Sequence, residues 1–420
     1  MTKTRLFLLT LAASLSVGLA YTGARTGHWT LPGVTAAHAQ DAAPGAARPV
    51  TIGQLLVVPG KPQRRMNYLI AGVTPEYSGY HTKAPESFGG LADSIILAQM
   101  DPDSNTVRML SLPRDTQMSR PDGRYVKLNA VIPTFGADGM VKVVENFSGL
   151  TLDGYLIVNL NAVRDLTDAL GGIDVYVPKR MYYTDSAAKL SIDLQEGQQH
   201  LNGQQAEAFV RFRHDALGDI GRVQRQQTFI RAVAQRLLSP AGVAALPKVT
   251  KVLEADTRSN MDASDFSAAL GMMRQRPRLE TFMLPGNFKN EGGVSYWGVD
   301  GAGLQRLLGA HFTDAPQEGA VDRGELNVAL VNTGASARTI QAVRARLRDA
   351  GYGHVYVADV VGGDPARSAV LSQASPAVLR DVRGALGFGE PRTSGEGVLG
   401  ADVTVWVGED ATLPDEGDHE

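Results

Sequence analysis

The chain lacks several features that would point to common classes of protein. It contains no cysteine, so disulfide bonds and thiolate metal sites are excluded, and burial and hydrogen bonding alone must hold the fold. Its formal net charge is −3, and no dense lysine or arginine tract is present, which argues against binding to a nucleic-acid backbone. G-x-S-x-G, Walker A and H-E-x-x-H patterns are missing too, so triad hydrolases, nucleotide hydrolases and zinc peptidases have no support.

One short catalytic pattern is present but incomplete. Ser186 and Lys189 fit the S-x-x-K pattern of penicillin-binding proteins, yet no K-T-G element follows them. Patterns of this length often arise by chance, so we give this nucleophile no weight.

The N-terminus predicts export. Lys3 and Arg5 precede an apolar run from Leu6 to Tyr21, which is the pattern of a secretory signal or a short uncleaved membrane anchor over residues 1–22. The run is slightly short for a spanning helix of roughly 20 residues. Small residues at Gly18-Leu19-Ala20 and at Ala37-His38-Ala39 offer two cleavage sites, so cleavage and retention of the anchor both stay open.

Composition predicts two folded domains after a linker. Residues 23–62 are rich in Ala, Gly, Pro and Thr and are expected to form a flexible linker. A chain of 420 residues is too long for one ordinary domain. We expect a larger domain over 63–313, a smaller one over 324–408 and an acidic tail over 409–420.

Strand and helix patterns are intermixed in both parts, which predicts an α/β fold. In the larger domain the expected strands are 66–73, 94–100, 107–112 and 173–177, and the expected helices are 141–150, 162–170, 204–209 and 222–238, with an extended segment at 210–213. The acidic turn 101–105 should join its neighbouring strands as a hairpin. The smaller domain should place strands 326–331, 354–360 and 403–407 around helices 337–350 and 376–386.

The most informative stretch is rich in arginine. In an extended segment at 210–213, Arg211 and Arg213 would point to the same side. Arg222 and Arg225 then follow in what should be the first turns of a helix, where free backbone N–H groups and the helix dipole favour an anion. Guanidinium groups match phosphate oxygens bidentately, so the cluster predicts a site for a phosphate-like dianion.

Other charged residues extend or weaken this interpretation. Arg114 is a candidate fifth arginine, and Asp93 and Asp115 stand at the ends of the predicted hairpin. One or two carboxylates beside a pyrophosphate suffice for an Mg²⁺ site. The alternatives are that the two aspartates cap turns and that the arginines form surface ion pairs, for instance with Asp215 and Asp219.

Taken in order along the chain, these residues resemble the LytR-CpsA-Psr family of cell-envelope glycopolymer ligases. The likeness is carried by 67–73, Ala92-Asp93-Ser94, Leu112-Pro113-Arg114-Asp115-Thr116, Lys127-Leu128-Asn129-Ala130, 169–175, 200–206, the Arg211 and Arg213 pair, and 221–227. Residues 326–408, with Val331-Asn332-Thr333-Gly334, are similar to the LytR-type C-terminal domain often found in this family.

The resemblance implies a fold and a reaction. It implies a mixed central sheet with helices on both faces, a groove for a polyprenyl chain, and a mouth where arginines hold a pyrophosphate beside Mg²⁺. The reaction would transfer a glycan from a polyprenyl-pyrophosphate carrier to a hydroxyl of peptidoglycan, and pyrophosphatase activity is a second activity of such a site. The protein would then work in the cell envelope, at the extracytoplasmic face of the cytoplasmic membrane, or be secreted if the signal is cleaved.

The resemblance also assigns roles to individual residues of this sequence. Asp93 matches a family metal ligand and, with Arg114, a catalytic position. The residues that match phosphate contacts or stand as their partners are Arg114, Arg211, Arg213, Arg222, Arg225 and Gln227.

Two departures from the family pattern keep an alternative open. The family usually carries an aspartate in a Gly-x-Asp pattern where this chain has Thr74, and Glu76 is the nearby acid that would have to replace it as a metal ligand. Leu91 stands where an arginine is common. A protein that binds the lipid-linked glycopolymer as a scaffold without turnover is therefore the alternative function. A transcriptional regulator is disfavoured by the export signal and by the lack of a basic helix-turn-helix pattern.

Overall fold

The computed structural model describes residues 62–74, 88–119, 125–159, 161–185, 190–212, 218–273, 275–313, 321–359 and 363–412. The predicted signal or anchor, nearly all of the predicted linker, the S-x-x-K pattern at 186–189, Glu76 and Arg213 lie outside these residues. None of the helices that are described is both long enough and apolar enough to cross a membrane.

The chain divides into two compact units. The first extends to Leu304, and the second comprises the rest of the chain together with the short segments Tyr176–Lys179 and Glu280–Met283. The boundaries 63–313 and 324–408 therefore stay predictions, and each unit is described by itself.

The first unit is built on a mixed sheet, as predicted. The strand order is β11 (Thr257–Ser259), β6 (Gly154–Asn159), β1 (Met66–Thr74), β2 (Leu91–Asp101), β3 (Thr106–Ser111) and β12 (Arg278–Met283). β1 runs parallel to β6 and antiparallel to β2. β2 and β6 are buried along nearly their whole length, which is the pattern of strands covered on both faces.

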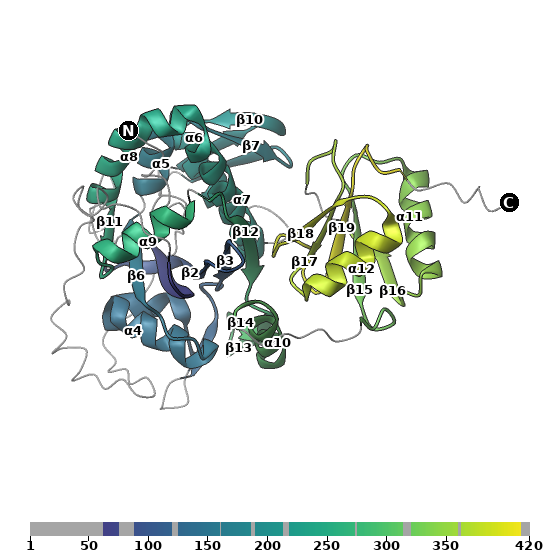
Figure 1. The fold of residues 1–420 in the computed structure, drawn as a ribbon, viewed down its shortest axis with the longest axis horizontal. Coiled ribbons are helices and arrows are strands. Elements are labelled where there is room, and N and C mark those ends of the chain that lie inside the picture. The colour runs from purple at the N-terminus through teal and green to yellow at the C-terminus, as the bar shows by residue number, and fades with distance from the viewer. Residues whose placement is uncertain are drawn as a thin grey trace. The chain divides into compact units, whose positions relative to one another are not determined.

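Helices cover both sides of this sheet. α4 (Val131–Ser148) contacts β2 and β6, and Figure 1 shows α5 to α9 on the side of the sheet away from α4. The remaining helices of this unit are α5 (Asn161–Ala169), α6 (Gly203–Arg211), α7 (Gly218–Leu238), α8 (Pro240–Asp256) and α9 (Ala263–Met273), and α10 (Gly301–His311) begins in this unit and continues into the second. The α/β class with helices on both faces is thereby confirmed.

Short antiparallel ribbons complete the first unit. β4 (Gln117–Ser119) pairs with β5 (Tyr125–Lys127), and β13 (Gly286–Glu291) pairs with β14 (Val294–Val299). The others are β8 (Met181–Asp185) with β9 (Leu190–Leu194), and β7 (Ile173–Val177) with β10 (Gly197–Leu201).

The extended segment predicted at 210–213 is wrong for its first two residues. Val210 and Arg211 form the last turn of α6, and Phe212 is its C-cap. The helix starts at a capping box in which the Asn202 side chain accepts from the Gln205 backbone N–H and the Gln205 side chain accepts in return. The capping box and the buried side chains of Phe209 and Val210 stabilise the helix as far as Arg211. The alternation of apolar and charged residues at 210–213 therefore does not form a strand.

The prediction for the next helix was nearly right. α7 begins at Gly218, ahead of the predicted start at Arg222. Val223, Ile230 and Leu237 are buried as expected, whereas Ala234 is half-buried.

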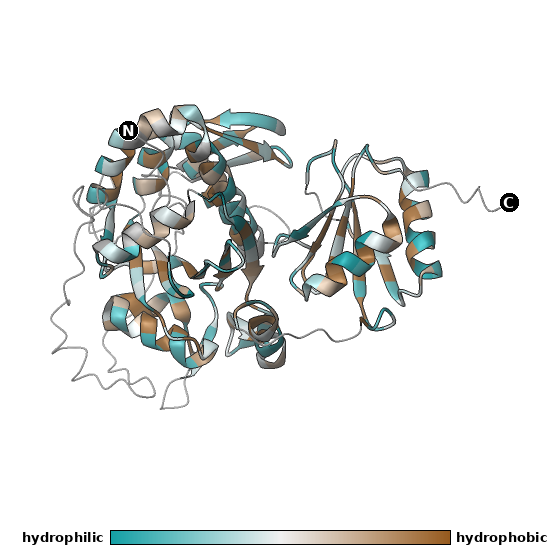
Figure 2. Cartoon of the chain, viewed as in Figure 1, coloured by the Kyte–Doolittle hydropathy of each residue, from teal (hydrophilic) through white to brown (hydrophobic). Residues whose placement is uncertain are grey.

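The second unit is a smaller α/β body. Its sheet has the order β16 (His354–Val357), β15 (Asn327–Asn332), β19 (Val403–Val407), β17 (Ala369–Ser372) and β18 (Glu390–Thr393), with helices α11 (Ala337–Asp349) and α12 (Pro376–Leu386). Figure 2 shows hydrophobic residues along β15 and β19, and Val328, Leu330 and Val405 belong to the buried core. The predicted elements are present, and β17 and β18, of four residues each, were not predicted.

The hairpin of β2 and β3 is confirmed, and its turn depends on a buried carboxylate. Asp101 accepts hydrogen bonds from the backbone N–H of Asp103, 3.0 Å, and of Ser104, 3.2 Å, and from Arg108 Nη1, 2.8 Å. Burial raises the pKa of Asp101, but the hydrogen bonds from Arg108 and Ser104 outweigh it, so the pKa falls from 3.8 to about 2. Asp101 is therefore ionised in the fold and stabilises the turn.

We expect Asp101→Asn to lower the free energy of unfolding at neutral pH by about 2 kcal/mol, because the ionised group is favoured in the folded state. A depressed folded pKa contributes stability above the unfolded value near 4, and that contribution is lost as the pH falls toward 2. Denaturant unfolding at several pH values measures the effect. Asp103→Asn, an exposed change in the same turn, is the control, and equal losses for both variants would contradict the account.

Candidate active site

A β-bulge between β1 and β2 places the predicted metal ligand. Gly72 pairs with Ser94 and Val73 with Ala92, so Asp93 is the extra residue on β2. A bulge bends its strand and re-aims the side chain of the extra residue. Asp93 is only 3% exposed, so its carboxylate lies inside the protein and requires polar partners.

Asp93 receives those partners from two neighbouring segments. Arg114 Nη1 donates to Oδ1 of Asp93, and Thr74 Oγ1 donates to Oδ2 at 2.5 Å. Arg114 is itself 8% exposed, so this is a buried ion pair with an added hydroxyl. Thr74, the residue that departs from the family pattern, thus contacts the carboxylate directly.

The loop after β3 holds Arg114 in place. The Thr116 N–H donates to the carbonyl of Pro113 at 3.0 Å, and the Asn129 N–H donates to the carbonyl of Arg114 at 3.0 Å. Asp115 Oδ1 lies 3.8 Å from Arg114 Nε and 3.1 Å from Lys127 Nζ. Asp115 is therefore engaged in ion pairs beside the site, and its predicted role as a second acid for a metal ion stays a prediction.

Helix α7 is attached to the same strand ends. Ser94 Oγ donates to Gln226 Oε1 at 3.2 Å, and Gln227 Nε2 donates to Ser111 Oγ at 3.1 Å. Both glutamines are buried. The two hydrogen bonds therefore fasten α7 to the start of β2 beside Asp93 and to the end of β3, where the Arg114 loop begins.

The two predicted arginines of α7 are buried rather than solvated. Arg222 is 0% and Arg225 7% exposed, so neither is a solvated surface side chain, and the alternative partners Asp215 and Asp219 lie outside the described side chains. Arg225 donates to the Phe212 carbonyl, and its guanidinium lies 5.5 Å from the centre of the Phe212 ring. α7 begins at Gly218, so both arginines lie beyond the first-turn residues whose backbone N–H groups are free. The prediction that they stand where these N–H groups and the helix dipole favour an anion is therefore wrong.

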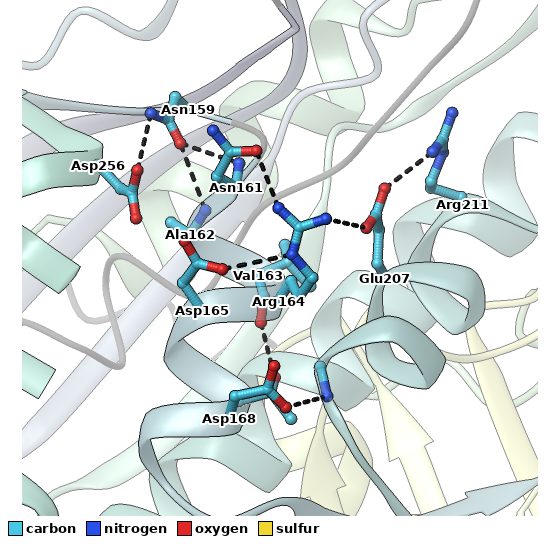
Figure 3. Close-up of polar contacts among 12 residues, drawn as sticks. Asn159, Asn161, Ala162, Val163, Arg164, Asp165, Asp168, Glu207, Arg211 and Asp256 are labelled. Carbon is cyan, nitrogen blue, oxygen red and sulfur yellow. Dashed lines mark hydrogen bonds and ion pairs between the residues drawn. The ribbon is translucent and has the colours of Figure 1, made fainter. Parts of the chain in front are cut away.

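Arg211 has other partners. Its Nη1 lies 2.8 Å from Glu207 Oε1, one turn earlier on α6, and Arg164 Nη1 lies 3.8 Å from Glu207 Oε2. Figure 3 shows this group, with Arg164 also donating to Asn161 Oδ1 at 3.2 Å. Arg211 is 10% exposed at its side chain. Arg213, its predicted partner on the same face, and Glu76 lie outside the described residues.

The oxygen donors around Asp93 are compatible with Mg²⁺. Among the described residues no group of three or more His, Cys, Asp or Glu side chains could hold a metal ion. The Asp93 carboxylate and the Thr74 hydroxyl are nevertheless hard oxygen donors side by side. Mg²⁺ often takes only one or two protein carboxylates and fills its shell with phosphate oxygens and water.

Sequence reasoning located the charged residues and Gln227 but missed the hydroxyl side chains that bond to the site. Thr74, Ser94 and Ser111 each bond to a predicted site residue or its neighbour on α7. Their partners are 19, 132 and 116 positions away, respectively. A hydroxyl side chain has no pattern of its own at such separations, so no local signal could have found these contacts.

The fold and this site define a mixed α/β protein with a buried carboxylate–arginine pair at a bulged strand. A family model confirms the class: the LytR_cpsA_psr family matches residues 32–312, and the chain belongs to that family. The match ends before the second unit's own sheet, so assignment of residues 326–408 to a LytR-type domain stays a prediction.

Two related proteins, one of them also through its crystal structure, show how far the similarity extends. The polyisoprenyl-teichoic acid–peptidoglycan teichoic acid transferase TagV of Bacillus subtilis (strain 168) is 33% identical over 190 residues, or 44% of this chain and 49% of TagV. The corresponding TagU of Bacillus anthracis is 28% identical over 222 residues, or 52% of this chain and 71% of TagU. The crystal structure of B. subtilis TagV matches with a TM-score of 0.48 at 27% identity, covering 58% of this chain and 94% of that one. The aligned part thus spans about half the length of the first relative.

The buried pair can be tested by a double-mutant cycle. We expect Arg114→Gln to lower the free energy of unfolding by about 3 kcal/mol, because it removes a cation from beside a buried carboxylate. Adding Asp93→Asn should recover part of that loss, with a coupling energy above about 1 kcal/mol. Denaturant unfolding measures each variant, and Arg180→Gln, in an ion pair with both side chains about half exposed, is the control. Strictly additive losses would show that the two side chains do not stabilise one another.

Proposed function

We propose that the chain is a phosphotransferase that moves a glycan from a polyprenyl-pyrophosphate carrier to peptidoglycan during assembly of the cell envelope. The observation that carries the proposal is the buried Asp93–Arg114 pair beside the arginine-bearing helix α7. Membership of the LytR_cpsA_psr family and similarity to TagV and TagU, both named as peptidoglycan teichoic acid transferases, support it.

The arginines supply positive charge where the reaction develops negative charge. In the proposed step the acceptor hydroxyl oxygen bonds to the phosphorus next to the glycan, and the bond from that phosphorus to the bridging oxygen breaks. Polyprenyl phosphate leaves with the electron pair, and the hydroxyl proton passes to an ionised carboxylate that acts as the base, for which Asp93 and Glu76 are the candidates. Fixed guanidinium groups stabilise such a transition state without reorganising. The proposed phosphate contacts are Arg114, Arg211, Arg213, Arg222, Arg225 and Gln227.

Magnesium is the proposed cofactor, and Asp93 is the residue that would hold it, with Thr74 beside it and Glu76 as a second candidate ligand. When bound with a pyrophosphate, Mg²⁺ neutralises charge on the phosphate oxygens. Arg114 already pairs with Asp93, so we infer that its guanidinium turns in part toward phosphate when the substrate binds. Pyrophosphatase activity would follow if water replaced the acceptor hydroxyl.

The proposed place of action is the extracytoplasmic face of the cytoplasmic membrane. The basic and then apolar order of residues 1–22 supports an N-terminal anchor, or a signal whose cleavage would release the protein. Membrane attachment and the face of the membrane are therefore parts of this proposal.

A second candidate function is a scaffold that binds the lipid-linked glycopolymer without turnover. Thr74 favours it, because a hydroxyl stands where the family usually offers a second carboxylate. A hydroxyl binds Mg²⁺ more weakly than a carboxylate does, so binding of the substrate could persist while the rate falls.

Transfer activity separates the two candidates. We expect the chain to transfer a glycan from a polyprenyl-pyrophosphate donor to a peptidoglycan acceptor, with loss of activity when Mg²⁺ is chelated. Asp93→Asn and the pair Arg222→Gln with Arg225→Gln should each lower kcat/KM by about 10²–10³, while Arg180→Gln should not. Circular dichroism checks that each variant is folded. Tight donor binding without transfer in the unaltered chain would favour the scaffold instead.

The metal site has a test that does not require activity. Thr74→Asp places a second carboxylate against Asp93, and we expect the like charges to lower stability by about 1–2 kcal/mol without Mg²⁺. Saturating Mg²⁺ should raise the Tm of this variant more than that of the unaltered chain, because binding to the folded state is stabilising. Thr74→Asn is the uncharged control. An equal response to Mg²⁺ in all three proteins would count against metal binding at Asp93.

A further inference from the structure

Exposed apolar side chains gather on one small part of the first unit. Of the eight large hydrophobic residues that are exposed among those described, Tyr125, Phe288, Val294 and Val299 lie on β5 or on the hairpin of β13 and β14. These side chains divide between the two faces of the hairpin: Phe288 lies on the face of Trp297, whereas Tyr125 contacts Tyr296 on the other face.

The register of the hairpin separates its two faces. Lys289 lies opposite Tyr296, and Phe288 lies opposite Trp297. Because successive side chains of a strand alternate, Lys289 and Tyr296 share one face, and Phe288 and Trp297 share the other. Phe288 packs edge-on against Trp297, with ring centres 5.2 Å apart.

The face with Tyr296 is extended by β5. Tyr125 meets Tyr296 edge-on, with ring centres 6.2 Å apart, and Lys289 Nζ lies 5.6 Å from the centre of the Tyr125 ring. Lys127 Nζ lies 5.9 Å from the centre of the Tyr296 ring. We call these four residues, Tyr125, Lys127, Lys289 and Tyr296, the tyrosine face.

The tyrosine face is a fixed surface rather than part of the core. Tyr125 is 41% exposed, whereas Tyr296 is 7% exposed, so an anchored ring supports an accessible one. The Lys289 stem lies across Gly298, with its Cδ 3.0 Å from the position that a Cβ of residue 298 would occupy. The absence of a side chain at Gly298 therefore lets Lys289 lie flat and leaves the Tyr125 ring open.

Short polar contacts connect the tyrosine face to the candidate active site. Asp115 Oδ1 lies 3.1 Å from Lys127 Nζ and 3.8 Å from Arg114 Nε. The backbone N–H of Trp297 donates to the carbonyl of Asp115 at 2.9 Å. One residue, Asp115, thus joins the hairpin and Lys127 to the arginine that pairs with Asp93, so a molecule on the tyrosine face would lie next to the site.

We propose that the tyrosine face binds a glycan strand of peptidoglycan, the acceptor in the proposed reaction, and this inference rests on that proposed function. A pyranose ring has an apolar C–H side that packs on an exposed aromatic ring, and its hydroxyl groups suit the polar edge of tyrosine. An acceptor must reach the phosphate from solvent, and this surface borders the arginine that would hold the phosphate.

The charges of the tyrosine face favour this occupant over others. Lys127 lies beside Asp115, and Lys289 Nζ lies 3.6 Å from Glu291 Oε1. Among the described residues the charges of this face are therefore balanced, which suits a largely uncharged sugar polymer with scattered carboxylates. A polyanion such as nucleic acid, or the surface of an anionic membrane, would call for unbalanced basic charge.

Binding of soluble glycans to the full chain tests the inference. The probes are uncross-linked peptidoglycan strands and a neutral N-acetylglucosamine oligosaccharide, with affinity measured by calorimetry. We expect Tyr125→Ala to weaken binding of both probes by about tenfold, because it removes the exposed ring on which a sugar would stack. Lys289→Gln should weaken binding of the strand, which carries carboxylates, but not of the neutral sugar.

Two controls match the exposed tyrosine. Tyr182→Ala removes a ring that is 64% exposed and also has an arginine over it, Arg180, at 5.6 Å. Phe288→Ala removes an exposed ring from the other face of the same hairpin. Neither should alter glycan binding. Unchanged affinity in Tyr125→Ala, or an equal loss in Tyr182→Ala, would overturn the inference, as would a Tyr125 effect on binding to phosphatidylglycerol vesicles with none on glycans.

A transfer assay separates failure of this inference from failure of the proposed function. If both hold, Tyr125→Ala should raise the KM for the peptidoglycan acceptor about tenfold and leave the KM for the donor unchanged. Transfer with an unaltered acceptor KM would overturn the tyrosine face and keep the transferase. Glycan binding that depends on Tyr125 in a chain without transfer would overturn the transferase and keep the tyrosine face.

Discussion

The buried ion pair of Asp93 and Arg114 is the interaction around which the rest of the site is arranged. A carboxylate taken out of water must be paired and hydrogen-bonded, or the cost of burial destabilises the fold. The bulge in β2 turns Asp93 inward, the loop after β3 delivers Arg114, and the end of β1 supplies the Thr74 hydroxyl. Three adjacent strand ends are thereby held at one point.

The need of buried polar groups for hydrogen-bond partners also explains the position of helix α7. Gln226 and Gln227 bond to Ser94 and Ser111 at the ends of β2 and β3, so the helix that carries Arg222 and Arg225 cannot shift without breaking buried hydrogen bonds. Rigid placement of guanidinium groups is what electrostatic stabilisation of a phosphoryl transition state needs. The tyrosine face is coupled to this arrangement through Asp115, so a donor site and an acceptor surface would share one rigid framework.

Prediction from sequence worked where a pattern was long and failed where it was short. The apolar run of β1 and the helical period of α7 were recognised, and so was the alternation of α/β elements in the second unit. The extended segment predicted for Val210 and Arg211 is wrong because apolar and charged residues that alternate over only four positions occur both at the end of a helix and in a strand. β17 and β18, of four residues each, were not predicted.

The sequence by itself determined the absence of cysteine chemistry, the mixed α/β class, the membership of a family and the identity of the charged residues at the site, because composition, period and motif are local properties. Only the tertiary structure decided that Asp93 pairs with Arg114 and Thr74, that Arg211 pairs with Glu207, and that Tyr125 is exposed beside the site. Most of these contacts join residues far apart in the chain, and burial depends on everything that packs around a side chain. Neither is encoded in any single stretch of sequence.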